Sequence, residues 1–151
     1  MSHPQPPYSG ACLCGAVEVT VTAPPLLTFA CHCRDCQKFS ASAYSLSAMF
    51  PADAVTCTGE LIRGGLKSAE RAHFFCASCL NFVYSQVAGA EHRINLRISL
   101  LSDAAQFEPF LEMMTDTKMP WAHVPAAHSF ATQPQSPEAV QALMDEFAEQ
   151  W

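Results

Sequence analysis

Charge is scarce in this sequence, and positive charge is scarcest. Asp, Glu, Lys and Arg make up 15% of the 151 residues, whereas about 25% is usual for a globular domain. The eight Lys and Arg residues are scattered, and the formal net charge is −6. Nucleic-acid binding depends on clustered cations that face phosphates, so we expect no nucleic-acid partner. A surface this poor in charge is compatible with a homo-oligomer.

Long apolar runs are also missing. No stretch approaches the ~20 apolar residues that span a membrane, so we expect no membrane partner. The first residues contain neither the basic segment nor the apolar run of a secretory signal, and we therefore expect a cytoplasmic protein. Cytoplasmic thiols stay reduced, so the eight cysteines favour metal ligation over disulfides.

The distribution of proline and glycine suggests one domain behind a short lead. Residues 1–9 are rich in proline, which suits neither a helix interior nor a sheet, and we predict a disordered lead there. Structure is expected to begin at Gly10. The length fits a single domain over residues 10–151.

Most of this domain has the residue pattern of β-strands. The predicted strands, which alternate in polarity or are rich in β-branched residues, cover residues 16–22, 26–30, 43–49, 55–58, 61–63, 72–75, 82–86 and 92–100. One helix is predicted at the C-terminal end, where Ser136 can cap it and Pro137 suits its first position. Its apolar residues recur at helical spacing, namely Val140, Leu143, Met144, Phe147 and Trp151. The fold class is therefore mainly β with a C-terminal amphipathic helix.

Seven cysteines form three clusters, and they divide as four plus three. The clusters are Cys12 and Cys14, then Cys31, Cys33 and Cys36, then Cys76 and Cys79. Structural zinc is closed by four protein ligands, usually two short pairs, while catalytic zinc keeps one exchangeable position. The first and last clusters together suit a closed site. The middle cluster suits an open one.

Spacing alone leaves other partitions possible. Cys33 and Cys36 could join Cys76 and Cys79 in a zinc ribbon, or the last pair could be a disulfide or redox pair. Cys57 lies in an apolar alternation and is interpreted as a small buried hydrophobe, with a fourth ligand to the open site as the alternative.

The turn after each cysteine pair also carries an expectation. A Cys-x-x-Cys turn usually needs a backbone kink after its second cysteine, which Gly15 provides after Cys14. Leu80 occupies that position after Cys79, and we expect Asn81 to take up part of the role because it tolerates positive φ.

These motifs resemble the glutathione-dependent formaldehyde-activating enzyme family, which also includes centromere protein V and has the Mss4-like fold. The resemblance runs from residue 9 to 121. The segments that carry it are Gly10-Ala11-Cys12-Leu13-Cys14-Gly15-Ala16-Val17, Cys31-His32-Cys33-Arg34-Asp35-Cys36-Gln37-Lys38, Gly59-Glu60-Leu61, His73-Phe74-Phe75-Cys76-Ala77-Ser78-Cys79 and Thr117-Lys118-Met119-Pro120-Trp121.

The resemblance implies folded-over β-sheets around two Zn²⁺ ions in a single zinc-binding domain over residues 10–151. It places a structural zinc on the four cysteines of the first and last clusters and a catalytic zinc on the middle cluster. The implied activity is that of a carbon–sulfur lyase acting on a small-molecule thiol adduct such as S-hydroxymethylglutathione, with glutathione or a similar thiol as co-substrate.

Four further residues are candidates for roles at the open site. His32 and Asp35 lie between the ligands and are the nearest proton carriers, although both residue types also serve as solvent-facing or supporting groups. Arg34 and Lys38 are candidates for contact with a glutathione carboxylate. Trp121 either covers the site or belongs to the core. A non-catalytic zinc scaffold that binds a protein partner is the alternative function.

Overall fold

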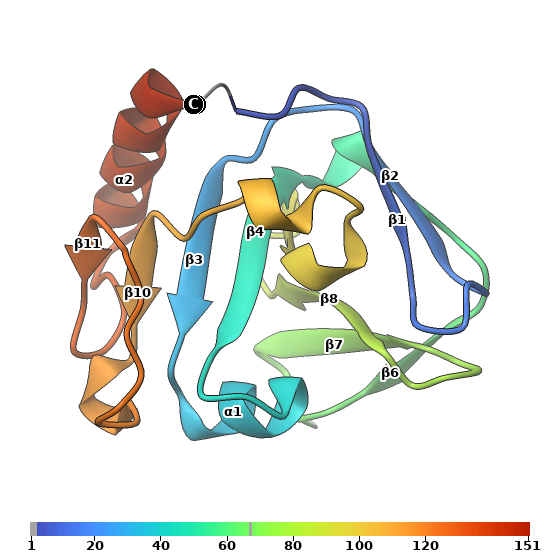
Figure 1. The fold of residues 1–151 in the computed structure, drawn as a ribbon, viewed down its shortest axis with the longest axis horizontal. Coiled ribbons are helices and arrows are strands. Elements are labelled where there is room, and N and C mark those ends of the chain that lie inside the picture. Colours follow the sequence, from blue (N-terminus) through green and yellow to red (C-terminus); the bar gives the residue numbers. More distant parts are fainter. Residues whose placement is uncertain (1–2, 67) are drawn as a thin grey trace.

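The computed structural model describes residues 3–66 and 68–151, and it confirms a mainly β fold with a C-terminal helix (Figure 1). A small antiparallel sheet has the strand order β1-β2-β5. A large mixed sheet has the order β11-β10-β3-β4-β9-β8-β7-β6. The strands are β1 Tyr8–Ala11, β2 Glu18–Val21, β3 Leu27–Cys31, β4 Ser45–Pro51, β5 Val55–Thr58, β6 Leu61–Gly64, β7 Arg71–Cys76, β8 Phe82–Val87, β9 Arg93–Arg97, β10 Leu111–Met113 and β11 His128–Ser129.

Helices and short turns of 3-10 helix connect these strands. The helices are α1 Arg34–Ser40 and α2 Pro137–Gln150, and the 3-10 turns are Ala52–Ala54, Ile98–Leu100, Ala104–Gln106 and Thr115–Thr117. Figure 1 shows α2 beside β3 and β10, with the small sheet on the opposite side of the molecule. In the part of the chain that the structure describes, neither helix is long and apolar enough to cross a bilayer.

Alternation along the strands gives the large sheet two distinct faces. Leu27, Phe29 and Cys31 point to one face, which we call the helix face because Leu143 and Phe147 of α2 pack there. The opposite face, called the core face, packs against the small sheet. The three-cysteine cluster therefore begins on the same face as α2.

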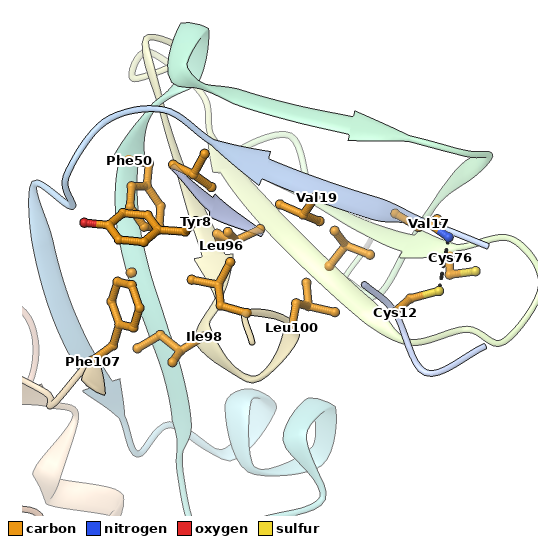
Figure 2. Packing of buried hydrophobic residues seen from close by; sticks show 14 residues of the cluster. Tyr8, Cys12, Val17, Val19, Phe50, Cys76, Leu96, Ile98, Leu100 and Phe107 are labelled. Carbon is orange, nitrogen blue, oxygen red and sulfur yellow. Dashed lines mark hydrogen bonds between the residues drawn. The ribbon is translucent and has the colours of Figure 1, made fainter. Parts of the chain in front are cut away.

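The core face carries the main hydrophobic cluster (Figure 2). Val19 of the small sheet and Val17, just before it, belong to the same cluster as Phe50 and Leu96 of the large sheet. In Figure 2, Cys12 and Cys76 lie at one end of this cluster, so the buried pair of sulfurs closes the space between the sheets. Both sheets thus share one hydrophobic core, and Cys12 and Cys76 lie at one end of it.

Gly10 is needed where the two sheets meet. It forms an isolated bridge with Leu101, and a Cβ at this position would lie 1.9 Å from the carbonyl oxygen of Leu100. Any larger residue would push β1 away from the loop that follows β9.

The predicted start of the structure at Gly10 requires a correction. Strand β1 begins at Tyr8, whose ring is buried and whose hydroxyl donates to the carbonyl of Pro4 at 3.0 Å. His3 stacks on Trp151 with ring centroids 4.4 Å apart. Buried aromatic surface therefore anchors the proline-rich segment, whereas residues 1–2 of the predicted lead lie outside the described residues.

Period-two alternation predicted eight strands close to where they occur, and Ser136 caps α2 through a bond from the backbone N–H of Ala139 at 3.1 Å. The predicted strand over 92–100 ends at Arg97, because the chain turns into 3-10 helix at Ile98. Strands β10 and β11 were not predicted. They have three and two residues and pair in parallel, so they contain too few positions for a period to emerge.

Candidate metal centre

The first and last cysteine clusters come together as predicted. The sulfurs of Cys12, Cys14, Cys76 and Cys79 all lie within 4.8 Å of one another. Two of the distances are 3.6 Å (Cys12 to Cys14) and 3.8 Å (Cys14 to Cys76). Zinc–sulfur bonds of about 2.3 Å in a tetrahedron place sulfurs about 3.8 Å apart. The donor set therefore fits one Zn²⁺.

Backbone N–H groups also point at these sulfurs. The N–H of Val17 donates to Cys12 Sγ at 3.2 Å, and the N–H of Cys79 donates to Cys76 Sγ at 3.5 Å. Burial alone would raise the pKa of Cys12, but the bond from Val17 and the sulfurs of Cys76 and Cys14 outweigh it and lower the pKa to about 6. Cys12 therefore favours the thiolate that metal binding requires, whereas at Cys76 the N–H of Cys79 is outweighed by burial and by the sulfurs of Cys12 and Cys79, which raise its pKa to about 11.

The turn after Cys79 differs from the expectation. Leu80 itself adopts a left-handed conformation with φ of 61°, as Gly15 does after Cys14 with φ of 80°. Asn81 acts through its side chain instead, because its Oδ1 accepts a bond from the N–H of Leu13 at 2.9 Å. The prediction that Asn81 takes the positive φ is therefore wrong, and this residue ties the two cysteine turns together.

The middle cluster forms a separate group of three. The sulfurs of Cys31, Cys33 and Cys36 lie within 4.8 Å of one another, at the end of β3 and the start of α1. Among the described residues, the structure brings no fourth His, Cys, Asp or Glu into this group. Cys57 pairs with Val19 in the small sheet and packs on the core, as its hydrophobe interpretation predicts. All eight cysteines are free thiols, so the disulfide alternative does not form, and the grouping of Cys76 and Cys79 with the first cluster excludes the zinc ribbon.

Helix α1 was not predicted, and it organises this group. Cys33 Sγ accepts the N–H of Cys36 at 3.3 Å and so caps the helix. Contacts with Cys31 and Cys36 lower the pKa of Cys33 to about 2, while contacts with Cys33 and Cys36 raise that of Cys31. Three sulfurs this close cannot all be thiolates without repelling one another, so their pKa values diverge. A bound cation would remove this repulsion.

His32 lies away from solvent rather than in an open site. It is fully buried, and its Nε2 lies 2.9 Å from Glu112 Oε2. Lys118 Nζ donates to the same oxygen at 2.7 Å, and Ser129 Oγ donates to Oε1 at 3.1 Å. Burial alone would raise the pKa of Glu112, but these hydrogen bonds outweigh it and hold that pKa below its ordinary value. The ionised carboxylate only accepts, so His32 donates to it through its Nε2–H.

The other predicted site residues lie on α1 and are exposed. Asp35 is in the first turn, and Arg34 and Lys38 line a shallow groove of about 410 Å³. Arg34 also donates to Gln37 Oε1 at 2.7 Å. Trp121 lines the same groove and is 69% exposed, so its core interpretation is wrong.

Arg97 is a site residue that the sequence analysis missed. It lies on the helix face of β9 and pairs with Ser47 of β4. Cys31 pairs with Ser45, two residues along β4, so Arg97 and Cys31 lie on the same face of the sheet. Its side chain is 8% exposed and donates to Ser47 Oγ at 3.3 Å. Its guanidinium lies 5.2 Å from the ring centroid of Phe82. Among the described residues, no carboxylate lies within ion-pair distance of it.

The electrostatics of Arg97 link it to the three cysteines. Burial lowers the pKa of its guanidinium, while the charges of Cys36 and Cys31 act in the opposite direction. The sequence held one signal for this residue, since it is the one charged residue in the run Ile94 to Leu101. Glu112 has the same signal in Phe110 to Met114. In both cases the sequence indicates a buried charge that needs a partner, but it does not indicate which residue the partner is.

A family of known proteins matches the part of the chain that contains both cysteine groups. The model of a family described as glutathione-dependent formaldehyde-activating enzyme matches residues 7–117. Among curated proteins there is no significant match. The crystal structure of a Rhodobacter sphaeroides protein superposes with a TM-score of 0.52 at 20% identity, covering 62% of this chain and 87% of that chain. At this identity the likeness supports a shared fold alone.

Proposed function

The chain belongs to the glutathione-dependent formaldehyde-activating enzyme family, and on that premise we propose that it is a zinc-dependent carbon–sulfur lyase. The proposed substrate is a thiol adduct such as S-hydroxymethylglutathione, which is formed from, or cleaved into, glutathione and formaldehyde. One Zn²⁺ is structural and the other serves the reaction.

The observation that carries this proposal is the difference between the two cysteine groups. Four sulfurs form the first group, whereas three form the second, beside a buried cation. Zinc held by three thiolates offers a fourth position that prefers a soft, anionic ligand and lowers the pKa of a thiol there. Arg97 supplies positive charge on the same sheet face, which offsets the negative charge that a substrate thiolate adds.

The reaction moves one proton. For adduct formation, the thiolate sulfur attacks the formaldehyde carbon, the carbonyl electron pair moves to oxygen, and that oxygen takes up a proton. Asp35 is the proposed proton carrier, because it is exposed and directly precedes Cys36. His32 is a positioning residue in this proposal, since its Nε2 is held by Glu112 and its backbone oxygen accepts from Gln37 and Thr117.

The groove beside α1 suits the rest of a glutathione-like molecule. Arg34 and Lys38 supply positive charge for a carboxylate, and the exposed indole of Trp121 supplies an apolar wall. Helix α1 carries both Cys36 and these cations, so it joins one side of the groove to the sulfur group.

Turnover of the adduct tests the proposal. Zinc-loaded protein should accelerate formaldehyde release from S-hydroxymethylglutathione, followed with a trapping reagent, and Cys33→Ser should abolish the acceleration. Cys57→Ser is the matched control, because this thiol belongs to neither group. Failure of the loaded wild-type protein to accelerate the reaction in either direction would refute the lyase assignment.

A zinc-dependent interaction scaffold is the second candidate, and one observation favours it. Leu13 and Leu80 sit on the two cysteine turns and are 86% and 62% exposed. The bond between Leu13 and Asn81 holds both turns side by side, so the four-cysteine site presents two apolar side chains to solvent. Under this alternative, replacing both leucines by serine would abolish partner binding and leave zinc content unchanged.

A further inference from the structure

A second cavity lies on the helix face of the large sheet; one end reaches Met113, which pairs with Cys31, and the other end lies farther along the strands. Its volume is about 190 Å³. Leu27, Phe29 and Met49 form an apolar floor, and Val140 of α2 contributes to a wall. Arg71 and Arg93 line the same cavity. An apolar pocket with a few converging polar groups is the usual form of a small-molecule site.

The strand register holds the two arginines as a pair. Arg71 pairs with Val87, and the pairing of Ser85 with Asn95 places Val87 beside Arg93 on the next strand. Both arginines therefore flank Val87 on one sheet face, with Cα atoms about 10 Å apart, two strand spacings. Long side chains from these positions can converge on one ligand group between them.

Neither arginine has a carboxylate partner in the described part of the chain. The ion pairs there involve Glu112 and Glu146 only, and the one side-chain hydrogen bond of Arg93 among the described residues is to Met144 Sδ of α2, at 3.7 Å. Acidic residues outnumber basic ones, fourteen to eight, yet two half-buried guanidinium groups line one apolar cavity without an acid. This arrangement matches an anion with an apolar body.

We propose that this cavity binds a small monocarboxylate whose body is an aromatic ring or a short alkyl chain. The carboxylate would lie between Arg71 and Arg93, where guanidinium groups can donate paired hydrogen bonds. The body would lie on Leu27, Phe29 and Met49 under α2. An apolar cavity of about 150 Å³ holds one benzene molecule, so about 190 Å³ accommodates a ring with one carboxylate.

The arginine pair that binds the carboxylate in this proposal lies well apart from the three cysteines. Arg93 pairs with Pro51 and Cys31 pairs with Ser45, so six residues of β4 separate the two positions. At 3.3 Å per residue this is about 20 Å along the strand. The three residues of a glutathione molecule extend about 11 Å, which is shorter than this separation.

Calorimetric titration of the zinc-loaded protein with benzoate tests the proposal, with benzyl alcohol as the uncharged probe. Benzoate should bind with one site per chain in the millimolar range or tighter, and at least tenfold more tightly than the alcohol. Arg71→Gln and Arg93→Gln should each weaken benzoate binding at least tenfold. Arg63→Gln is the matched control, because Arg63 is exposed on β6 outside the cavity and should leave binding unchanged.

The outcomes separate this proposal from the proposed function. Binding that persists in Cys36→Ala supports a site independent of the sulfur group. Three results would overturn the proposal. They are no benzoate binding at a concentration of about 10 mM, an equal affinity for benzyl alcohol, or an equal loss of benzoate affinity in Arg63→Gln and Arg93→Gln. The lyase assignment would survive each of these, because its test uses the thiol adduct.

Discussion

The backbone N–H of Leu13 donates to the side-chain oxygen of Asn81 at 2.9 Å, across 68 residues of sequence. Each residue belongs to a turn that presents two cysteines, so this bond fixes how the two pairs face each other. Leu80, next to Asn81, has a positive φ that glycine would adopt without strain. The four-cysteine site therefore contains one backbone position that is costly for its own residue.

Leu80→Gly should stabilise the zinc-loaded protein by about 1 kcal/mol, because a left-handed conformation costs a non-glycine residue roughly that amount. For a chain of this length the melting temperature should rise by about 2–4 °C. Leu13→Gly is the control, since Leu13 is also an exposed leucine on the partner turn but has no positive φ. It should lower the melting temperature. Equal shifts in both variants would contradict strain at Leu80.

Glu112→Gln should destabilise the protein by about 2–3 kcal/mol, because it removes the charge that holds Lys118 and buried His32. Glu146→Gln is a matched control, since Glu146 lies at the same 2.9 Å from His128 but on the surface. Its cost should stay below about 1 kcal/mol. Denaturant unfolding of both variants measures the difference. Similar costs would show that burial of the Glu112 network contributes nothing.

Acid should reduce the advantage of wild type over Glu112→Gln. The folded pKa of Glu112 is lowered, so its contribution is present above the unfolded value of about 4.3 and is lost as pH falls through the folded value. Comparing the two proteins at each pH removes effects of metal loss, which both share. A melting-temperature gap that stays constant from neutral pH to pH ~3 would contradict the assignment.

The parts of the fold that sequence predicted are those set by local pattern. Period-two alternation identified eight strands, and Ser136 with Pro137 marked the start of α2. Helix α1 escaped because its cap is Cys33, a residue interpreted only as a ligand. Spacing favoured the observed cysteine grouping, because short pairs limit how sulfurs can share an ion, but it left the zinc ribbon possible, and the family resemblance implied the same partition that the structure has.

The site residues that escaped depend on contacts far apart in sequence. Arg97 meets the sulfur group only through the register of β3, β4 and β9. Glu112 meets His32 through β10, which pairs in parallel with β3 across 80 residues. No local period encodes either neighbour. Proximity in sequence nominated His32 as a proton carrier, but its burial against Glu112 makes it a positioning residue in our proposal.

Arg97→Met should weaken thiol binding at least tenfold and leave zinc content unchanged, because it removes a buried positive charge without removing a ligand. Arg97→Lys should restore part of the affinity. Calorimetry with glutathione and elemental analysis measure the two effects. Arg63→Met, which changes an exposed arginine, is the control. Loss of zinc from Arg97→Met, or unchanged thiol affinity, would contradict the role given to this charge.

Thiol binding at the three-cysteine site is the most direct test of the central claim. Zinc-loaded protein should hold two zinc ions per chain and bind one molecule of glutathione, or of an uncharged thiol such as 2-mercaptoethanol. Binding should strengthen as pH rises toward the cysteine thiol pKa of about 8.5, since the thiolate is the ligand. Cys36→Ala should lose one zinc and all thiol binding while the fold persists. If neither thiol binds fully metallated protein at millimolar concentration, the open site and the lyase assignment are both wrong.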